Sequence, residues 1–190
     1  MLWPEPIPTM GDLNQFVGHI FLDERVESPP TVLRRRARIH AANLVRYAGV
    51  EPLSVESLHG VLMGSDRSDY RQQTAEVIFH AGRIVDGDFP RASAVPQLML
   101  QAFTPMYEIV FKTALAEWFK AEVAWKIYAI GFCIQPFARE SEVLFRLLQN
   151  HVRQTHGLRW QTRLFSAQME YEQVCEFRAN VFKPTYAEFY

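Results

Sequence analysis

The sequence is poor in cysteine, in net charge and in long apolar runs, and each shortage excludes a class of protein. Two cysteines, Cys133 and Cys175, among 190 residues do not make the disulfide framework of a small secreted domain, so both are expected to be reduced. The formal net charge of −1 gives no overall attraction to nucleic acid or to an anionic membrane. No segment approaches about 18 uninterrupted apolar residues, so no membrane partner is predicted.

Residues 1–11 are rich in proline and are expected to be extended, with neither the basic nor the apolar region of a signal peptide. The sequence therefore predicts a cytoplasmic protein, with the alternative of an effector that is exported without a cleavable signal. Its apolar content of 48% and its length fit one folded domain over residues 1–190. The six histidines do not cluster, so neither a metal site nor a cofactor is predicted.

Apolar residues at helical spacing predict a mainly α-helical fold. The predicted helices begin near Asp12 and then span about 31–47, 54–63, 95–103, 114–133, 142–156 and 161–181. Ser54 is the predicted cap of the third helix, and Gly157 is the predicted stop of the helix over 142–156. Between residues 64 and 90 the helical period disappears, and Val77-Ile78-Phe79 with nearby turn residues predicts a small β-hairpin.

Two of these helices carry definite expectations about the core. In the helix over 31–47, the inward residues are expected to be Leu33, Ala37, Ala41 and Leu44. The helix over 114–133 is apolar on most faces and is expected to be the buried central element. Its aromatic residues are therefore expected in the core, namely Trp118, Phe119, Trp125, Tyr128 and Phe132.

The segment that follows this apolar helix is the most informative part of the sequence. It reads Ile-Gln-Pro-Phe-Ala-Arg-Glu-Ser-Glu-Val-Leu-Phe-Arg-Leu-Leu over residues 134–148 and opens the next helix. Its setting and order resemble the Fic/Doc family, which carries His-Pro-Phe-x-x-Gly-Asn-Gly-Arg and then Arg-Leu-Leu at this place. Pro136, Phe137 and Arg146 match that pattern.

Other segments resemble the same family in the same order, over roughly residues 12–165. They are Leu58-His59-Gly60-Val61-Leu62, then Asp69-Tyr70-Arg71 before Val77-Ile78, then Phe89-Pro90, and then Val95-Pro96-Gln97-Leu98-Met99. The resemblance implies a Fic-like helical bundle around a buried central helix, with the β-hairpin as a flap.

The chemistry of the family is missing from the matching positions. Gln135 replaces the catalytic histidine and cannot act as a general base, and Arg139 replaces the metal-binding acid. The phosphate cradle is replaced by Glu140, Ser141, Glu142 and Val143. Two carboxylates would lie where phosphates bind, and the loss of the glycines removes easy access to positive φ. The resemblance therefore implies a pseudoenzyme.

Three functions follow from this interpretation. The first is a non-catalytic interaction module, an adaptor or regulator, that binds a partner protein through the flap residues Val77, Ile78 and Phe79. The second is a divergent nucleotidyl- or phosphate-group transferase whose base lies outside the motif, with Glu140 or Glu142 in a new role. The third is a nucleotide binder without turnover. Because the family includes bacterial toxins, secreted effectors and housekeeping proteins, the cellular role, the partner and the oligomeric state stay open.

Three further features have less specific interpretations. Arg34-Arg35-Arg36 and Arg38 form a basic run, for which a solvated, salt-bridged helix face is favoured over nucleic-acid binding. The family's inhibitory Ser/Thr-x-x-x-Glu pattern occurs at Ser166–Glu170 and twice elsewhere, so it is not distinctive. The aromatic C-terminal tail, residues 182–190, is expected to dock on the domain or on a partner.

Overall fold

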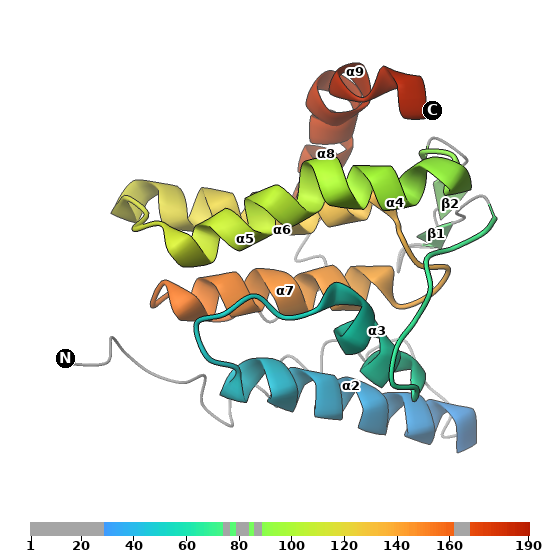
Figure 1. Cartoon of the computed structure of the whole chain (residues 1–190), viewed down its shortest axis with the longest axis vertical. Helices are drawn as coiled ribbons and strands as arrows, with labels where there is room; N and C mark the ends of the chain where they lie inside the picture. Colours follow the sequence, from blue (N-terminus) through green and yellow to red (C-terminus); the bar gives the residue numbers. More distant parts are fainter. Residues whose placement is uncertain (1–28, 74–76, 79–83, 86–88, 162–167) are drawn as a thin grey trace.

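The computed structural model describes residues 29–73, 77–78, 84–85, 89–161 and 168–190, and over these residues the chain is mainly helical (Figure 1). The predicted fold class is thus confirmed. The extended segment 1–11, the helix predicted near Asp12, Phe79 and Ser166 lie outside the described residues.

The α-helices are α2 (Pro29–Tyr47), α3 (Val55–Met63), α4 (Val95–Leu98), α5 (Thr104–Lys112), α6 (Glu117–Ile134), α7 (Ser141–Thr155), α8 (Gln168–Phe177) and α9 (Lys183–Thr185). Tighter 3₁₀ turns are η1 (Ala92–Ala94) and η4 (Ala187–Phe189), and wider π turns are η2 (Met99–Phe103) and η3 (Arg178–Phe182). The strands β1 (Val77–Ile78) and β2 (Ile84–Val85) pair antiparallel, as the hairpin prediction required.

Helix α7 lies in the middle of the bundle, with α6 and the α4–α5 rod on one side and α2 and α3 on the other (Figure 1). Nearly every residue of α7 from Ser141 to Val152 is buried. In α6 the burial is confined to its C-terminal part, Ile127–Ile134, and to Val123 and Ala124. Tyr128 and Phe132 are in the core as expected, but Trp118 is 78% exposed, so that part of the prediction was wrong. The centre of the bundle is therefore shared by α6 and α7.

The two central helices approach closely at Gly131. A Cβ atom at this position would lie 2.1 Å from Cδ1 of Phe145, a ring that is fully buried in α7. No side chain fits between the two helices at this height, so glycine is required for the close contact.

Local signals set several helix ends as the sequence predicts. Ser54 caps α3, with its Oγ accepting a hydrogen bond from the backbone N–H of Ser57 at 3.2 Å. Gly157 follows α7 with φ 74°, in the left-handed region that glycine enters at little cost.

The buried face of α2 differs from the predicted one. Ala41 is buried as expected, whereas Leu33 is 66% exposed and Leu44 is 41% exposed. The inner stripe instead consists of Arg38, Ala41, Ala42 and Val45, at the i, i+3, i+4, i+7 spacing of one helix face. The prediction failed because a charged residue, Arg38, is part of the inner stripe and was counted as a solvent-facing position.

Both π turns precede a proline. Turn η2 ends two residues before Pro105, and turn η3 ends two residues before Pro184. A proline ring clashes with the carbonyl four residues earlier and offers no N–H to it. The wider turn relieves this clash, so each helical rod continues through its proline.

The aromatic tail packs on its own domain. Phe182 and Phe189 are buried, and the backbone N–H of Arg91 donates to the carbonyl oxygen of Phe189 at 2.8 Å.

None of the helices in the described part of the chain combines the length and the apolar character that a membrane span requires.

Candidate functional site

The candidate site is the turn between α6 and α7, residues 135–140, which carries the degenerate motif. Its first and last residues, Gln135 and Glu140, have φ values of 45° and 58°. Within the described ranges they are the non-glycine residues with positive φ. Glu140 thus adopts positive φ although it is not glycine, and the conformation is not an easy one for it. The left-handed conformation persists there and costs roughly 1–2 kcal/mol for a residue with a side chain.

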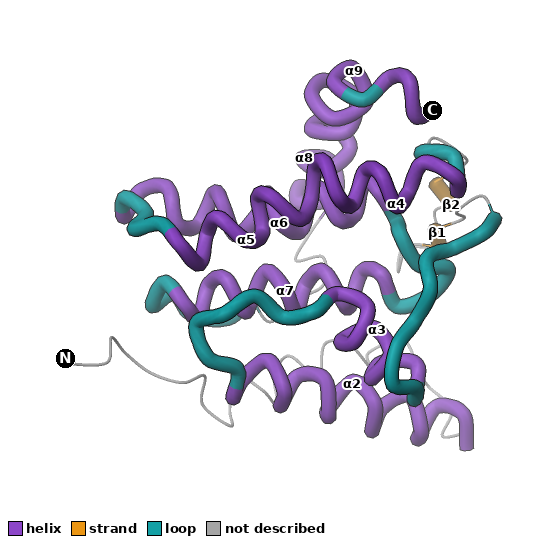
Figure 2. Tube along the Cα trace, viewed as in Figure 1, coloured by secondary structure: helices purple, strands orange, loops and turns teal. Residues whose placement is uncertain are grey.

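The loop that runs from α3 toward β1 (Figure 2) contains Arg71, whose side chain bonds to the first residue of the turn. Its Nε donates to the carbonyl oxygen of Gln135 at 2.6 Å, and its backbone N–H donates to that of Pro136 at 2.8 Å. Its Nη2 reaches the carbonyl oxygen of Pro90, also at 2.6 Å. Although burial lowers the pKa of Arg71, a guanidinium remains protonated at neutral pH. One buried cation thus joins the turn to two other segments.

Ser141 closes the middle of the turn. Its hydroxyl donates to the carbonyl oxygen of Phe137 at 2.9 Å and accepts from the backbone N–H of the same residue at 3.2 Å. The side chain is buried, so these bonds replace those that water would make. The hydroxyl group of Ser141 is therefore engaged within the turn both as a donor and as an acceptor.

Glu140 is held by a guanidinium fork from α2. Arg38 donates from Nε to Oε2 and from Nη2 to Oε1 of Glu140, both at 2.8 Å, and both side chains are largely buried. Arg34 approaches the same carboxylate at 3.8 Å. Bidentate pairs of this kind are the stronger class of ion pair, because the planar fork matches the carboxylate. The charge of this carboxylate is thus compensated by the basic run on α2.

His59 packs on the other face of the turn. Its ring is stacked on Phe137, with the centroids 3.8 Å apart and the planes 7° apart. Its Nε2 lies 2.8 Å from the carbonyl oxygen of Arg139, so this nitrogen carries the proton. Its Nδ1 is buried and has no hydrogen-bond partner among the described residues. Burial lowers the pKa of His59, while the bond to Arg139 and the charge of Glu140 act in the opposite direction.

Several of the residues that match or replace the motif face the interior, whereas Arg139 is exposed. Gln135 is 4% exposed, and its Nε2 is buried without a hydrogen-bond partner in the described part of the chain. Phe137 and Val143 are also buried. Arg146 is fully buried, with its guanidinium carbon 3.9 Å from the ring centroid of Tyr128. A group that reacts with a substrate would need access that these side chains lack.

The remaining acid, Glu142, is in the first turn of α7, where a negative charge complements the helix dipole. Tyr128 donates to its Oε1 at 3.5 Å. Among the described residues, no three His, Cys, Asp or Glu side chains gather as a metal site would require. Among the described residues this turn thus offers a paired carboxylate and a neutral imidazole, and no nucleophile is bonded to that imidazole.

Three segments that are far apart in the sequence, around His59, Tyr70-Arg71 and Pro90, converge on this turn. His59 and Tyr70 both contact Phe137, and Arg71 bonds to the turn and to Pro90. Sequence reasoning noted these residues as pieces of a resemblance but did not assign them to the site. The partner role of Arg38 was missed altogether, because nothing local in the sequence indicates a contact with a residue 102 positions away.

The predicted flap and basic run are placed as follows. Val77 pairs with Val85 and Ile78 with Ile84, while Phe79 lies outside the described residues. Arg35 and Arg36 are on the exposed side of α2, away from the inner stripe that holds Arg38.

Comparison with known proteins gives no assignment. No family model matches the sequence, and no curated protein matches it.

Proposed function

We propose that this chain is a Fic-like domain that has lost catalysis and acts as an interaction module, an adaptor or regulator, for a partner protein. The convergence of His59, Tyr70, Arg71 and Pro90 on the turn at Phe137 supports the likeness, because separate matching segments contribute to one structural unit.

The single observation that best supports the proposed loss of catalysis is the ion pair between Arg38 and Glu140. In this proposal Glu140 takes the place of the first cradle glycine, and a guanidinium fork fixes its carboxylate with two bonds of 2.8 Å. A phosphate at this turn would meet a fixed negative charge, and it would have to compete for a cation that is already engaged. Gln135 adds a second obstacle, since its amide takes up no proton near neutral pH.

Titration calorimetry tests this part of the proposal. ATP added to the purified protein, with and without magnesium, should release no heat of binding. Labelled ATP, GTP and CTP should modify neither the protein nor proteins of a lysate, and Gln135→His should stay inert because the cradle is still missing. Nucleotide binding by the natural protein, or self-modification of Gln135→His, would contradict the loss of the nucleotide site.

The partner surface in this proposal is the edge of the β-hairpin. Strand order β1–β2 leaves the outer backbone edge of each strand without a strand partner in the described part of the chain. An extended segment of another protein can add to such an edge through main-chain hydrogen bonds.

Ile78→Pro removes one backbone donor and should abolish partner recovery in a pull-down, while Ile78→Val keeps the donor and serves as the matched control. A thermal melt of both variants should remain close to that of the natural protein, because the hairpin is outside the helical core. If Ile78→Pro recovers partners as well as Ile78→Val does, the hairpin edge is not the interface.

A specific observation favours a second candidate, a divergent group transferase. His59 is neutral, lies against the turn, and has an Nδ1 lone pair without a partner in the described part of the chain, so it could take a proton from a nucleophile after a local opening. If the labelled-nucleotide assay gives a signal, that signal should disappear in His59→Gln. Labelling that survives this substitution would exclude His59 as the base.

A further inference from the structure

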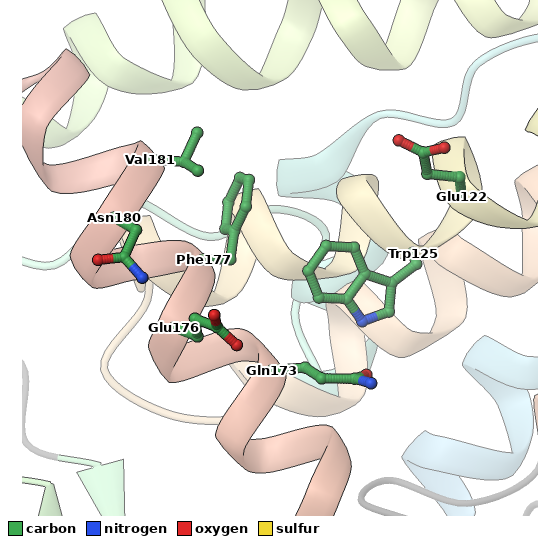
Figure 3. A pocket seen from close by; sticks show the side chains of 7 residues that line it. All are labelled: Glu122, Trp125, Gln173, Glu176, Phe177, Asn180 and Val181. Atoms are coloured by element: carbon green, nitrogen blue, oxygen red, sulfur yellow. The ribbon is translucent and has the colours of Figure 1, made fainter.

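A cavity of about 500 Å³ lies between α6 and the α8–η3 rod, away from the motif turn (Figure 3). Its wall is mostly apolar and is formed by Trp125, Phe177 and Val181, with polar side chains at the rim. The rings of Trp125 and Phe177 meet edge to face, with centroids 5.5 Å apart at 81°. Val181 is 51% exposed, so the apolar surface is open to solvent.

An unsatisfied donor lies in this wall. The Nε1 of Trp125 is shielded from solvent and has no hydrogen-bond acceptor in the described part of the chain. Figure 3 shows the nitrogen edge of the indole on the side of Gln173. A buried donor without an acceptor costs free energy, and because this nitrogen is shielded, a ligand in the cavity reaches it only if the wall moves.

The rim is acidic. Glu176 lines the cavity, and Glu172 is one helical turn before it on α8, with both side chains exposed. Neither carboxylate has an ion-pair partner in the described ranges, whereas Glu122 on the opposite wall is paired with Lys126 at 2.8 Å. The side of the cavity formed by α8 therefore presents uncompensated negative charge.

The second wall of the cavity is irregular. Asn180 and Val181 belong to the π turn η3, whose widening is explained by Pro184. Such turns occur frequently at functional sites, because they shift side chains out of the regular helical positions.

We infer that this cavity is a docking site for a peptide segment of a partner protein that carries one large apolar side chain next to lysine or arginine. The apolar side chain would pack on Trp125, Phe177 and Val181. The basic side chain would meet Glu176 and Glu172. A peptide supplies both groups at once, whereas an apolar molecule alone would leave the negative charge of the rim unmatched. The site is separate from the hairpin edge, so either surface can fail its test without the other.

A random-peptide display library, selected on the immobilised full chain, tests the inference. Recovered peptides should share an apolar anchor flanked by lysine or arginine. Their affinity, measured by fluorescence anisotropy, should fall about tenfold or more in Val181→Asp and in Glu176→Lys. Both positions are exposed, so both variants should keep the thermal melt of the natural protein.

Matched controls separate the cavity from general effects of charge. Ile109→Asp introduces the same change at another exposed apolar residue, and Glu51→Lys reverses another exposed charge. Both variants, and Ile78→Pro in the hairpin, should bind the recovered peptides as the natural protein does. The inference is overturned if no basic apolar sequence is enriched, if acidic peptides are enriched, or if the selected peptides bind Val181→Asp unchanged. It is also overturned if only small apolar dyes bind at the cavity.

Discussion

At the scale of single residues, Glu140 has a strained backbone and a largely buried charge, and Arg38 is the neighbour that compensates for them. Its backbone is left-handed without being glycine, and its carboxylate is largely removed from solvent. The fork of Arg38 compensates the charge, and the same two bonds hold the side chain whose backbone is strained. Glycine would relieve the strain but would leave Arg38 without its carboxylate. The two contributions can therefore be separated by substitution.

We predict that Glu140→Ala destabilises the protein by about 2–3 kcal/mol, because Arg38 loses its partner in a largely buried place. Glu140→Gly loses the same ion pair but accepts positive φ without strain, so it should be more stable than Glu140→Ala by about 1 kcal/mol. Urea unfolding of both variants measures the difference. Equal stability of the two would mean that the turn relaxes to another backbone conformation.

At the scale of elements, α6 and α7 approach each other closely at Gly131. Helix propensity alone would favour alanine there by about 1 kcal/mol. The Cβ atom, however, would lie 2.1 Å from the buried Phe145 ring, so the two helices would have to separate.

We predict that Gly131→Ala lowers the free energy of unfolding by about 2 kcal/mol, since overpacking outweighs the gain in helix propensity. Gly49→Ala is the matched control, because a Cβ atom there meets nothing within 4 Å. It should change stability by no more than about 0.5 kcal/mol. Chemical denaturation of both variants is the measurement, and a Gly131→Ala variant as stable as Gly49→Ala would contradict the close packing.

Some features of the helices could be predicted from the sequence, and others could not. Ser54 and Gly157 are local signals that depend on few neighbours, so the ends of α3 and α7 could be predicted from the sequence. The buried face of α2 could not be predicted, because Arg38 is on it by virtue of a carboxylate from the distant turn before α7. The π turns had a signal in Pro105 and Pro184, but a proline in an apolar rod predicts a kink as readily as a widened turn.

The candidate site could also be predicted only in part. The turn itself was predictable, since Pro136 and Phe137 come directly after an apolar helix and shortly before the next helix. The groups that surround it were not, because His59 and Arg71 reach it from segments far away in sequence. Periodicity reports which face of a helix is apolar, and it carries no information on which distant polar group meets that face.

At the scale of the whole molecule, three histidines join separate parts of the bundle, two from buried positions and His156 from a partly buried one. His151 donates through Nε2 to the carbonyl oxygen of Gly49 at 3.0 Å, and its Nδ1 lies 3.0 Å from the hydroxyl of Tyr107. His156 contacts the carbonyl oxygen of Val110 at 2.9 Å, and His59 contacts the motif turn. Burial lowers the pKa of all three below the ordinary value of 6.5.

We predict that the protein loses stability as the pH falls from 7 to 5. The folded state binds protons at these histidines less readily than the unfolded state does, because the folded pKa values are lowered. The stabilisation is therefore complete above the ordinary pKa of about 6.5 and is lost as the pH falls through the folded values. Urea unfolding at several pH values measures this dependence.

His156→Gln provides the matched variant for this prediction. Its amide can still donate to the carbonyl oxygen of Val110 but takes up no proton, so its stability should fall less between pH 7 and pH 5. A free energy of unfolding that stays constant or rises over this interval would contradict the role of the histidines.

The pairing of α2 with α7 also has a consequence for synthesis on the ribosome. Arg38 and Glu140 are 102 positions apart, as are Gly49 and His151. At about 5–20 residues per second, α2 leaves the ribosome roughly 5–20 s before α7 is made. During that delay α3 can pack on α2, but the inner stripe of Ala41, Ala42 and Val45, with the charge of Arg38 at its end, still lacks α7. The nascent chain therefore presents an apolar helix face beside a positive charge, a surface that a chaperone can bind until α7 emerges.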